Sequence, residues 1–120
     1  MTENSRPNKR RLGTKYEKLA AAYLQKQGYE VVETNYRCFF GEIDLIAKDK
    51  STLVFCEVKY RTNASRGNPL EAVNHRKQQI IFKCAMNYLT FKCRREVPSR
   101  FDVIGFQGDK ICHIKNAFQG

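Results

Sequence analysis

The chain has 120 residues, with 22 Lys or Arg against 12 Asp or Glu, so its formal net charge is +10. This length predicts one domain, and the basic excess favours a polyanionic partner such as nucleic acid. The sequence has no apolar run of membrane-spanning length, and its first residues lack the apolar segment of a signal peptide. We therefore expect a cytoplasmic protein without membrane association.

The first part of the sequence predicts a tail and then a helix. Residues 1–12 are basic and have almost nothing to bury, which predicts a flexible tail before a single domain over residues 13–120. From Thr14 to Gln27 the apolar residues recur at helical spacing, and Gly28 provides a C-terminal stop.

The rest of the chain predicts five strands and a second helix. Asn68-Pro69 resembles an N-cap followed by proline at the first helical position, and the helical pattern continues to Leu89. Gly108-Asp109 suits a hairpin turn between the last two strands. The order α-β-β-β-α-β-β predicts an α/β fold in which helices flank a mixed β-sheet. The predicted strands are residues 29–36, 42–47, 53–61, 98–106 and 111–118.

The cysteines predict neither a disulfide framework nor a zinc site. There are five, an odd number, and no two form a C-x-x-C pair. Cys56, Cys84 and Cys112 lie in apolar segments, so we expect them to be small core residues of a reduced chain.

Two neighbouring strands place charged residues among apolar ones. Side chains two apart in a strand share a face, so Glu57 and Lys59 point the same way. If the two strands form a hairpin around a two-residue turn at Lys50-Ser51, Asp44 lies opposite Glu57. A register shift of one residue would move Asp44 to the other face. A Lys-Ser turn lacks the Gly or Asn preferred there and does not fix the register.

Converging carboxylates point to a metal site. Two like charges at such a distance need a compensating cation, and carboxylate oxygens suit Mg²⁺ or Mn²⁺. Such an ion could bind a scissile phosphate, while Lys59 could orient the attacking water or stabilise developing negative charge. The alternative is structural: Glu57 and Lys59 form a solvated strand face, and Asp44 pairs with a basic neighbour.

Glu17 and Lys77 also have structural interpretations. Glu17 follows Thr14 by three residues, the pattern of a capping box at the start of a helix. Lys77 near the start of the second helix is, from the residues alone, a solvated lysine.

The motifs resemble a known family. The runs G-E-I-D-L-I-A at 41–47 and L-V-F-C-E-V-K at 53–59 are similar to those of the YraN family, in the Holliday-junction-resolvase-like branch of the PD-(D/E)xK nuclease superfamily. Further matching motifs, which extend the resemblance over nearly the whole chain, are E-x-x-A-x-x-Y-L-x-x-x-G-Y from Glu17, Asn35-Tyr36-Arg37, Glu71-Ala72-Val73, Arg76-Lys77-Gln78 and Arg100-Phe101-Asp102-Val103.

The resemblance implies a restriction-endonuclease-like core and a catalytic site. In it Asp44 and Glu57 bind the metal, Glu17 is the helical acid that assists, and Lys59 is the lysine of E-x-K. The sequence departs from the superfamily motif at Ile43, where a proline often precedes the aspartate. Lys77 and Gln78 match an auxiliary helix motif.

The resemblance also implies a function. We expect a divalent-metal-dependent nuclease that hydrolyses DNA phosphodiester bonds at branched or single-stranded sites, and junction-cutting relatives imply a homodimer. Relatives that bind DNA without cutting it leave a second interpretation, a non-catalytic accessory protein; a structural or interaction protein is the third. The residues expected to contact nucleic acid are Arg61, Arg66, Arg76, Lys77 and Gln78.

Overall fold

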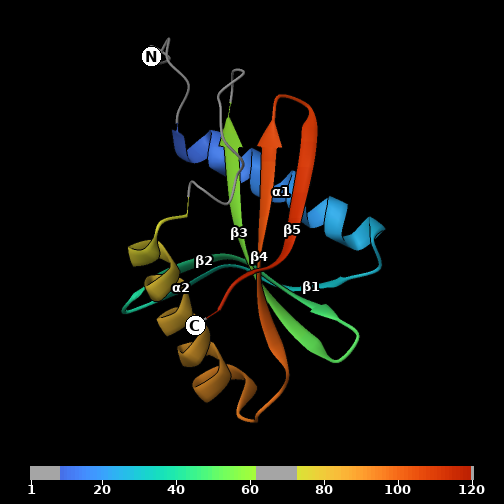
Figure 1. Ribbon diagram of the computed structural model, residues 1–120. Helices are drawn as coiled ribbons and strands as arrows, with labels where there is room; N and C mark the ends of the chain where they lie inside the picture. Colours follow the sequence, from blue (N-terminus) through green and yellow to red (C-terminus); the bar gives the residue numbers. More distant parts are fainter. Residues whose placement is uncertain (1–8, 62–72, 120) are drawn as a thin grey trace, which may run out of the picture.

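The computed structural model describes residues 9–61 and 73–119, which form two helices, a π-helical turn and five strands (Figure 1). Their order, α-β-β-β-α-β-β, confirms the predicted α/β arrangement. Neither helix is long and apolar enough to cross a membrane. The elements are α1 (Lys9–Lys26), β1 (Glu30–Cys38), β2 (Gly41–Asp49), β3 (Thr52–Arg61), α2 (His75–Tyr88), η2 (Leu89–Cys93), β4 (Ser99–Gln107) and β5 (Lys110–Phe118).

The five strands form one mixed sheet in the order β1-β2-β3-β4-β5. Three neighbouring pairs are antiparallel, whereas β3 and β4 are parallel. A parallel pair needs a crossover, and the segment containing α2 supplies it. The sheet is therefore mixed, as predicted.

The helices cover opposite faces of this sheet (Figure 1). On one face, Ala20 and Leu24 of α1 pack in a cluster that includes Cys56 of β3. On the other face, Ile81 of α2 packs in a cluster that includes Phe55 of β3. Because neighbouring β3 residues point to opposite helices, both faces of this central strand are buried.

The β2–β3 hairpin has the predicted register. Its pairs run from Leu45 opposite Cys56 to Asp49 opposite Thr52, which leaves Lys50 and Ser51 as the two-residue turn. Lys50 adopts a left-handed backbone with φ 60°, the conformation that Gly or Asn would favour. The strands thus adopt the predicted pairing although the turn residues do not favour it.

The first helix differs from the prediction. It begins at Lys9 and runs through Thr14, so the capping-box interpretation of Glu17 is wrong. Residues 9–12, which we expected in the tail, are helical, because Lys, Arg and Leu are good helix formers. Glu17 thus lies inside α1, where its side chain need not serve a helix terminus.

Two other expectations change. The second helix begins at His75, and Asn74 caps it by accepting a hydrogen bond from the N–H of Lys77 at 2.8 Å; Asn68-Pro69 lies outside the described residues. Cys112 is exposed rather than buried, because it lies on the edge strand β5, whereas Cys56 and Cys84 are core residues as expected.

A buried carboxylate joins the last two strands. Asp102 of β4 is 0% exposed and accepts hydrogen bonds from Arg100 Nε at 3.0 Å, His113 Nε2 at 2.7 Å and the N–H of Asn116 at 3.0 Å. Burial alone would raise the pKa of Asp102, but these hydrogen bonds outweigh it and lower the pKa below its ordinary value. Arg100 also contacts Asp49 at 3.0 Å.

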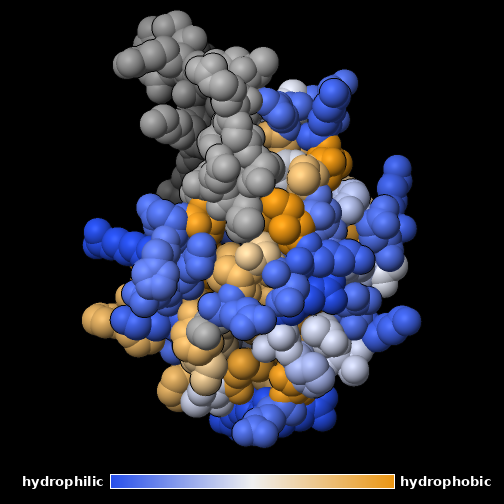
Figure 2. Space-filling model, in the orientation of Figure 1, coloured by the Kyte–Doolittle hydropathy of each residue, from blue (hydrophilic) through white to orange (hydrophobic). Residues whose placement is uncertain are grey.

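Hydrophilic side chains dominate the visible surface, and apolar ones reach it in smaller groups (Figure 2). Among the exposed large apolar residues, Phe39 is 96% and Phe91 is 67% exposed. Phe39 lies in the turn between β1 and β2.

Candidate functional site

Three carboxylates converge where α1 passes the beginning of β2. The acids are Glu17 of α1 and Glu42 and Asp44 of β2. One carboxylate oxygen from each lies within 4.8 Å of the other two. All three residues are half-buried. The structure therefore brings Glu17 close to Asp44, as the resemblance implies, and adds Glu42, which sequence reasoning missed.

Two backbone positions next to these acids have positive φ. Gly41 opens β2 with φ 152°, and a Cβ at this position would lie 2.7 Å from Cγ2 of Ile80 in α2. Glycine thus allows the β1–β2 hairpin to approach α2 closely. Asn35 in β1 has φ 51°, and its side chain hydrogen-bonds to Glu17.

Asp44 is held by the neighbouring strand. Its Oδ2 accepts a hydrogen bond of 2.8 Å from the backbone N–H of Val58. Burial, followed by the charge of Glu57, raises the pKa of Asp44 to about 7, although the Val58 N–H and the charge of Lys77 act in the opposite direction. Asp44 is thus a carboxylate whose ionisation is opposed by its surroundings.

Glu17 has a similar environment. Burial, followed by the charge of Asp44, raises its pKa to about 7, and the hydrogen bond from Asn35 partly opposes the increase. A divalent cation among these oxygens would favour the ionised form of both acids. The donor set and its electrostatics therefore fit a hard cation.

Glu57 is surrounded differently. It is 4% exposed, and its Oε2 lies 3.4 Å from Nζ of Lys59 and 3.6 Å from Nζ of Lys77. Glu57 is not in the group of three close carboxylates, although its charge acts on Asp44. The buried Glu57 and the two partly exposed lysines form an ion cluster beside the three acids.

Lys77 contributes to this cluster from the start of α2, the helix in the crossover between β3 and β4. It follows the cap residue Asn74 by three positions, so the first turn of α2 directs its ammonium group towards Glu57. The solvated-lysine interpretation of Lys77 is thus incomplete, because one ion pair links α2 to β3.

The other residues expected to contact nucleic acid are less organised. Arg76 is exposed, and Gln78 donates its side-chain amide to the carbonyl of Val73 at 2.9 Å. Arg61 is the last residue of β3, with its side chain outside the described part of the chain. Arg66 lies outside the described residues entirely.

Glu42 had a recognisable signal in the sequence. It stands two residues before Asp44 in G-E-I-D, and residues two apart in a strand share a face. Its Oε1 also lies 3.5 Å from Nε of Arg37 on β1. The sequence analysis considered only the contact between β2 and β3. It missed Glu42 because this residue belongs to the group that Asp44 forms with Glu17 of α1.

Comparison with known proteins identifies close relatives over nearly the whole chain. A family model described as "Uncharacterised protein family UPF0102" matches residues 16–106. A UPF0102 protein of Thermodesulfovibrio yellowstonii is 48% identical over 107 residues, which cover 89% of this chain and 95% of the relative. A UPF0102 protein of Lachnoclostridium phytofermentans is 46% identical and covers 92% and 95%. One of Syntrophus aciditrophicus is 46% identical and covers 99% and 93%.

Proposed function

This chain belongs to the uncharacterised protein family UPF0102, and we propose that it is a divalent-metal-dependent endonuclease that hydrolyses DNA phosphodiester bonds. The observation that supports the proposal best is the group of three carboxylates beside a buried Glu57 with two lysines. Oxygen ligands for a hard cation and a neighbouring ammonium group are the parts that this reaction needs. Similarity to the PD-(D/E)xK nuclease superfamily adds to the same proposal.

The metal is Mg²⁺ or Mn²⁺, and Glu17, Glu42 and Asp44 would hold it. Their oxygens are close enough to share one ion, and the pKa values of Glu17 and Asp44, both raised to about 7, indicate carboxylates that would gain from a cation. When bound, such an ion supplies Lewis-acid activation of the phosphate and of the attacking water. Glu57 contributes negative charge beside Asp44.

Lys59, Lys77 and Glu57 would act on the substrate and not on the metal. Lys59, whose side chain is 28% exposed, can donate hydrogen bonds to the attacking water and to the phosphate oxygens as negative charge develops. Oε2 of Glu57 forms ion pairs with the ammonium groups of both Lys59 and Lys77, which holds the two lysines close together. Glu57 is therefore a positioning residue for the lysines in this mechanism.

The substrate would be branched or single-stranded DNA, and the enzyme a cytoplasmic homodimer. The net charge of +10 supports binding to phosphates, and the exposed Arg76 next to Lys77 supports a contact near the site. The five cysteines are free, as expected in a reducing compartment.

The experiment offers labelled single-stranded, duplex, flap and four-way-junction DNA to the pure protein with Mg²⁺, Mn²⁺ or EDTA. Metal-dependent cutting is expected, and Asp44→Asn and Lys59→Ala should each abolish it. Binding without cutting under every condition would reject the enzyme and favour the non-catalytic accessory protein. Cutting that persists in both variants would show a contaminating nuclease.

A further inference from the structure

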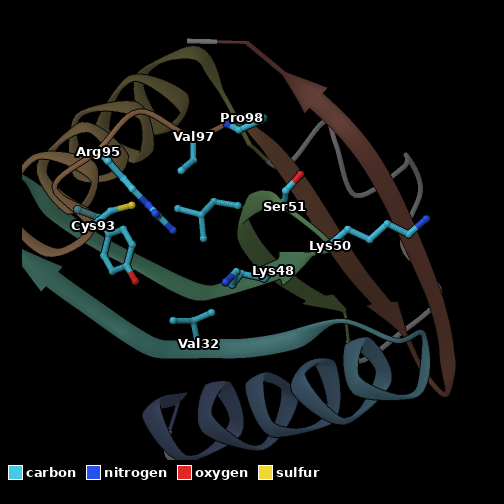
Figure 3. Close-up of a pocket in the computed structure, with 10 residues that line it drawn as sticks. Val32, Lys48, Lys50, Ser51, Cys93, Arg95, Val97 and Pro98 are labelled. Carbon is cyan, nitrogen blue, oxygen red and sulfur yellow. The ribbon is translucent and has the colours of Figure 1, made fainter.

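A pocket lies at the opposite end of β2 and β3 from the three carboxylates. It has a volume of about 500 Å³, within the range of small-molecule sites. It lies where the β2–β3 turn meets η2 and the start of β4 (Figure 3). Its described lining residues are Val32, Lys48, Lys50, Ser51, Leu53, Tyr88, Cys93, Arg95, Val97 and Pro98.

The charge of this pocket is positive. Its described lining contains Lys48, Lys50 and Arg95 but neither Asp nor Glu. Figure 3 shows the charged ends of Lys48 and Arg95 directed into the hollow, whereas Lys50 extends away from it. Lys48 is paired across the strands with Glu30, yet no ion pair within the described chain includes Lys48 or Arg95. Both cations are available to an anion.

The hydroxyl of the buried Tyr88 also lacks a hydrogen-bond partner in the described part of the chain. Tyr88 lines the pocket and is only 7% exposed, with its ring packed edge-on against Tyr36 and Phe55. Within residues 9–61 and 73–119, no group forms a hydrogen bond with the Tyr88 hydroxyl. Burial, followed by the negative charge of nearby Glu33, raises the pKa of Tyr88, so the hydroxyl keeps its proton and remains a donor. A buried donor without an acceptor costs free energy that a ligand oxygen would recover.

The remaining wall is apolar. Val32 of β1, Leu53 of β3 and the Val97-Pro98 segment contribute hydrocarbon surface. The pocket thus offers two cations and a hydroxyl donor beside an apolar wall. A ligand that fits it has an anionic group and an apolar or aromatic body.

We propose that this pocket binds a 5′-phosphorylated nucleotide, with the phosphate between Lys48 and Arg95 and the base against the apolar wall. A phosphate monoester carries a charge of about −1.5 to −2 at neutral pH and three strong acceptor oxygens. Two cations and the Tyr88 hydroxyl match that group better than they match a singly charged carboxylate. The nucleotide is either free or the 5′ end of a nucleic-acid strand.

This site is separate from the carboxylates. Lys48 follows Asp44 by four residues on β2, and Leu53 precedes Glu57 by four residues on β3, a separation of roughly 13 Å along each strand. The proposal therefore does not depend on metal binding or on nuclease activity.

The test uses the protein in EDTA with thymidine 5′-monophosphate, thymidine, inorganic phosphate, and a short oligothymidine with or without a 5′-phosphate. Binding is measured by calorimetry. Maleimide labelling, mapped by mass spectrometry, reports its location, since the half-buried Cys93 lines the pocket and the exposed Cys112 is an internal control. A phosphorylated ligand should slow labelling of Cys93 and leave that of Cys112 unchanged.

Substitution of the lining residues tests whether the ligand binds in this pocket. Lys48→Ala and Arg95→Ala should each weaken binding about tenfold, and Tyr88→Phe should weaken it less. Lys110→Ala removes the same charge from an exposed position on β5 and should have no effect.

The outcomes separate the two sources of the nucleotide and can reject the site. Protection by the monophosphate supports a free nucleotide, and protection only by the phosphorylated oligonucleotide supports a strand end. Equal binding of inorganic phosphate, equal weakening by Lys110→Ala, or unprotected Cys93 at millimolar ligand would each overturn the proposal.

Discussion

The backbone N–H of Val58 donates a 2.8 Å hydrogen bond to Oδ2 of Asp44, so one strand holds the carboxylate of its neighbour. Asp44→Asn keeps an acceptor for this N–H and removes only the charge. A metal at about 100 times its Kd should stabilise the wild type by about 2.7 kcal/mol, and Asp44→Asn should lose this stabilisation. Thermal unfolding with Mg²⁺, Mn²⁺ or EDTA measures the difference.

Asp44→Ala is the matched comparison. It removes the acceptor as well as the charge, so in EDTA it should be about 1–3 kcal/mol less stable than Asp44→Asn. Equal stability of the two variants would contradict the structural role of the Val58 hydrogen bond.

The stability of the metal-free protein should depend on pH. The folded-state pKa values of Glu17 and Asp44 are raised to about 7, whereas in the unfolded chain both carboxyls titrate near about 4. Between these values the folded state binds more protons, so the free energy of unfolding should fall as pH rises from about 5 to about 8 in EDTA. Urea unfolding across this range should show a smaller fall in Asp44→Asn.

Added metal should reduce the fall in the free energy of unfolding with rising pH. A cation competes with protons for the same carboxylates, so Mg²⁺ or Mn²⁺ should stabilise the protein more at pH 8 than at pH 5. A metal effect that is independent of pH would argue against Glu17 and Asp44 as ligands.

Glu42 should contribute to metal affinity. Glu42→Gln should weaken Mn²⁺ binding about tenfold, as expected when one of three carboxylates in a shared site becomes neutral. Calorimetric titration measures this change. Arg37→Ala is the control, because it removes the partner 3.5 Å from Glu42 and leaves the carboxylate intact. Unchanged affinity in Glu42→Gln, together with lost affinity in Glu17→Gln, would exclude Glu42 from the site.

Gly41 should tolerate substitution poorly. Its φ is 152°, and an added Cβ would lie 2.7 Å from Cγ2 of Ile80, so Gly41→Ala should cost about 2–4 kcal/mol. Gly28 also has a positive φ, 93°, but nothing lies within 4 Å of its added Cβ, so Gly28→Ala should show backbone strain of about 1 kcal/mol. Chemical denaturation of Gly41→Ala with and without Ile80→Ala measures the clash as a coupling energy.

The buried carboxylate of Asp102 should be essential for stability. Asp102→Ala removes the buried acceptor that Arg100 and His113 share and should cost about 3–5 kcal/mol in urea unfolding. Asp49 contacts the same arginine but its side chain is 32% exposed, so Asp49→Ala should cost less than about 1 kcal/mol. Similar costs for both variants would contradict the importance of burial.

The β2–β3 register was predictable only as the outcome of one turn, a two-residue turn at Lys50-Ser51, which gives the pairs that the structure shows. Both faces of these strands carry apolar side chains, so their pattern alone does not exclude a shift by one residue. The start of α1 was not predictable, because the capping-box pattern at Thr14 competes with good helix formers before it.

Contacts between distant segments were harder to predict. Glu42 joins Asp44 and Glu17 only because α1 crosses the beginning of β2, and hydrophobic periodicity does not specify that crossing. The network of Asp102 with His113 depends likewise on the pairing of β4 and β5. An aspartate between apolar residues in a sequence does not reveal which cation or backbone N–H will accompany it.

The ion pair between Lys77 and Glu57 has a consequence for the order of folding. The β2–β3 hairpin joins segments that are adjacent in the sequence, whereas Lys77 reaches Glu57 only when α2 packs against the sheet. Before that packing, Lys59 is the ion-pair partner that β3 itself provides for Glu57. Because the charge of Glu57 opposes the ionisation of Asp44 and the charge of Lys77 favours it, packing of α2 relieves repulsion within the hairpin and favours the completed topology.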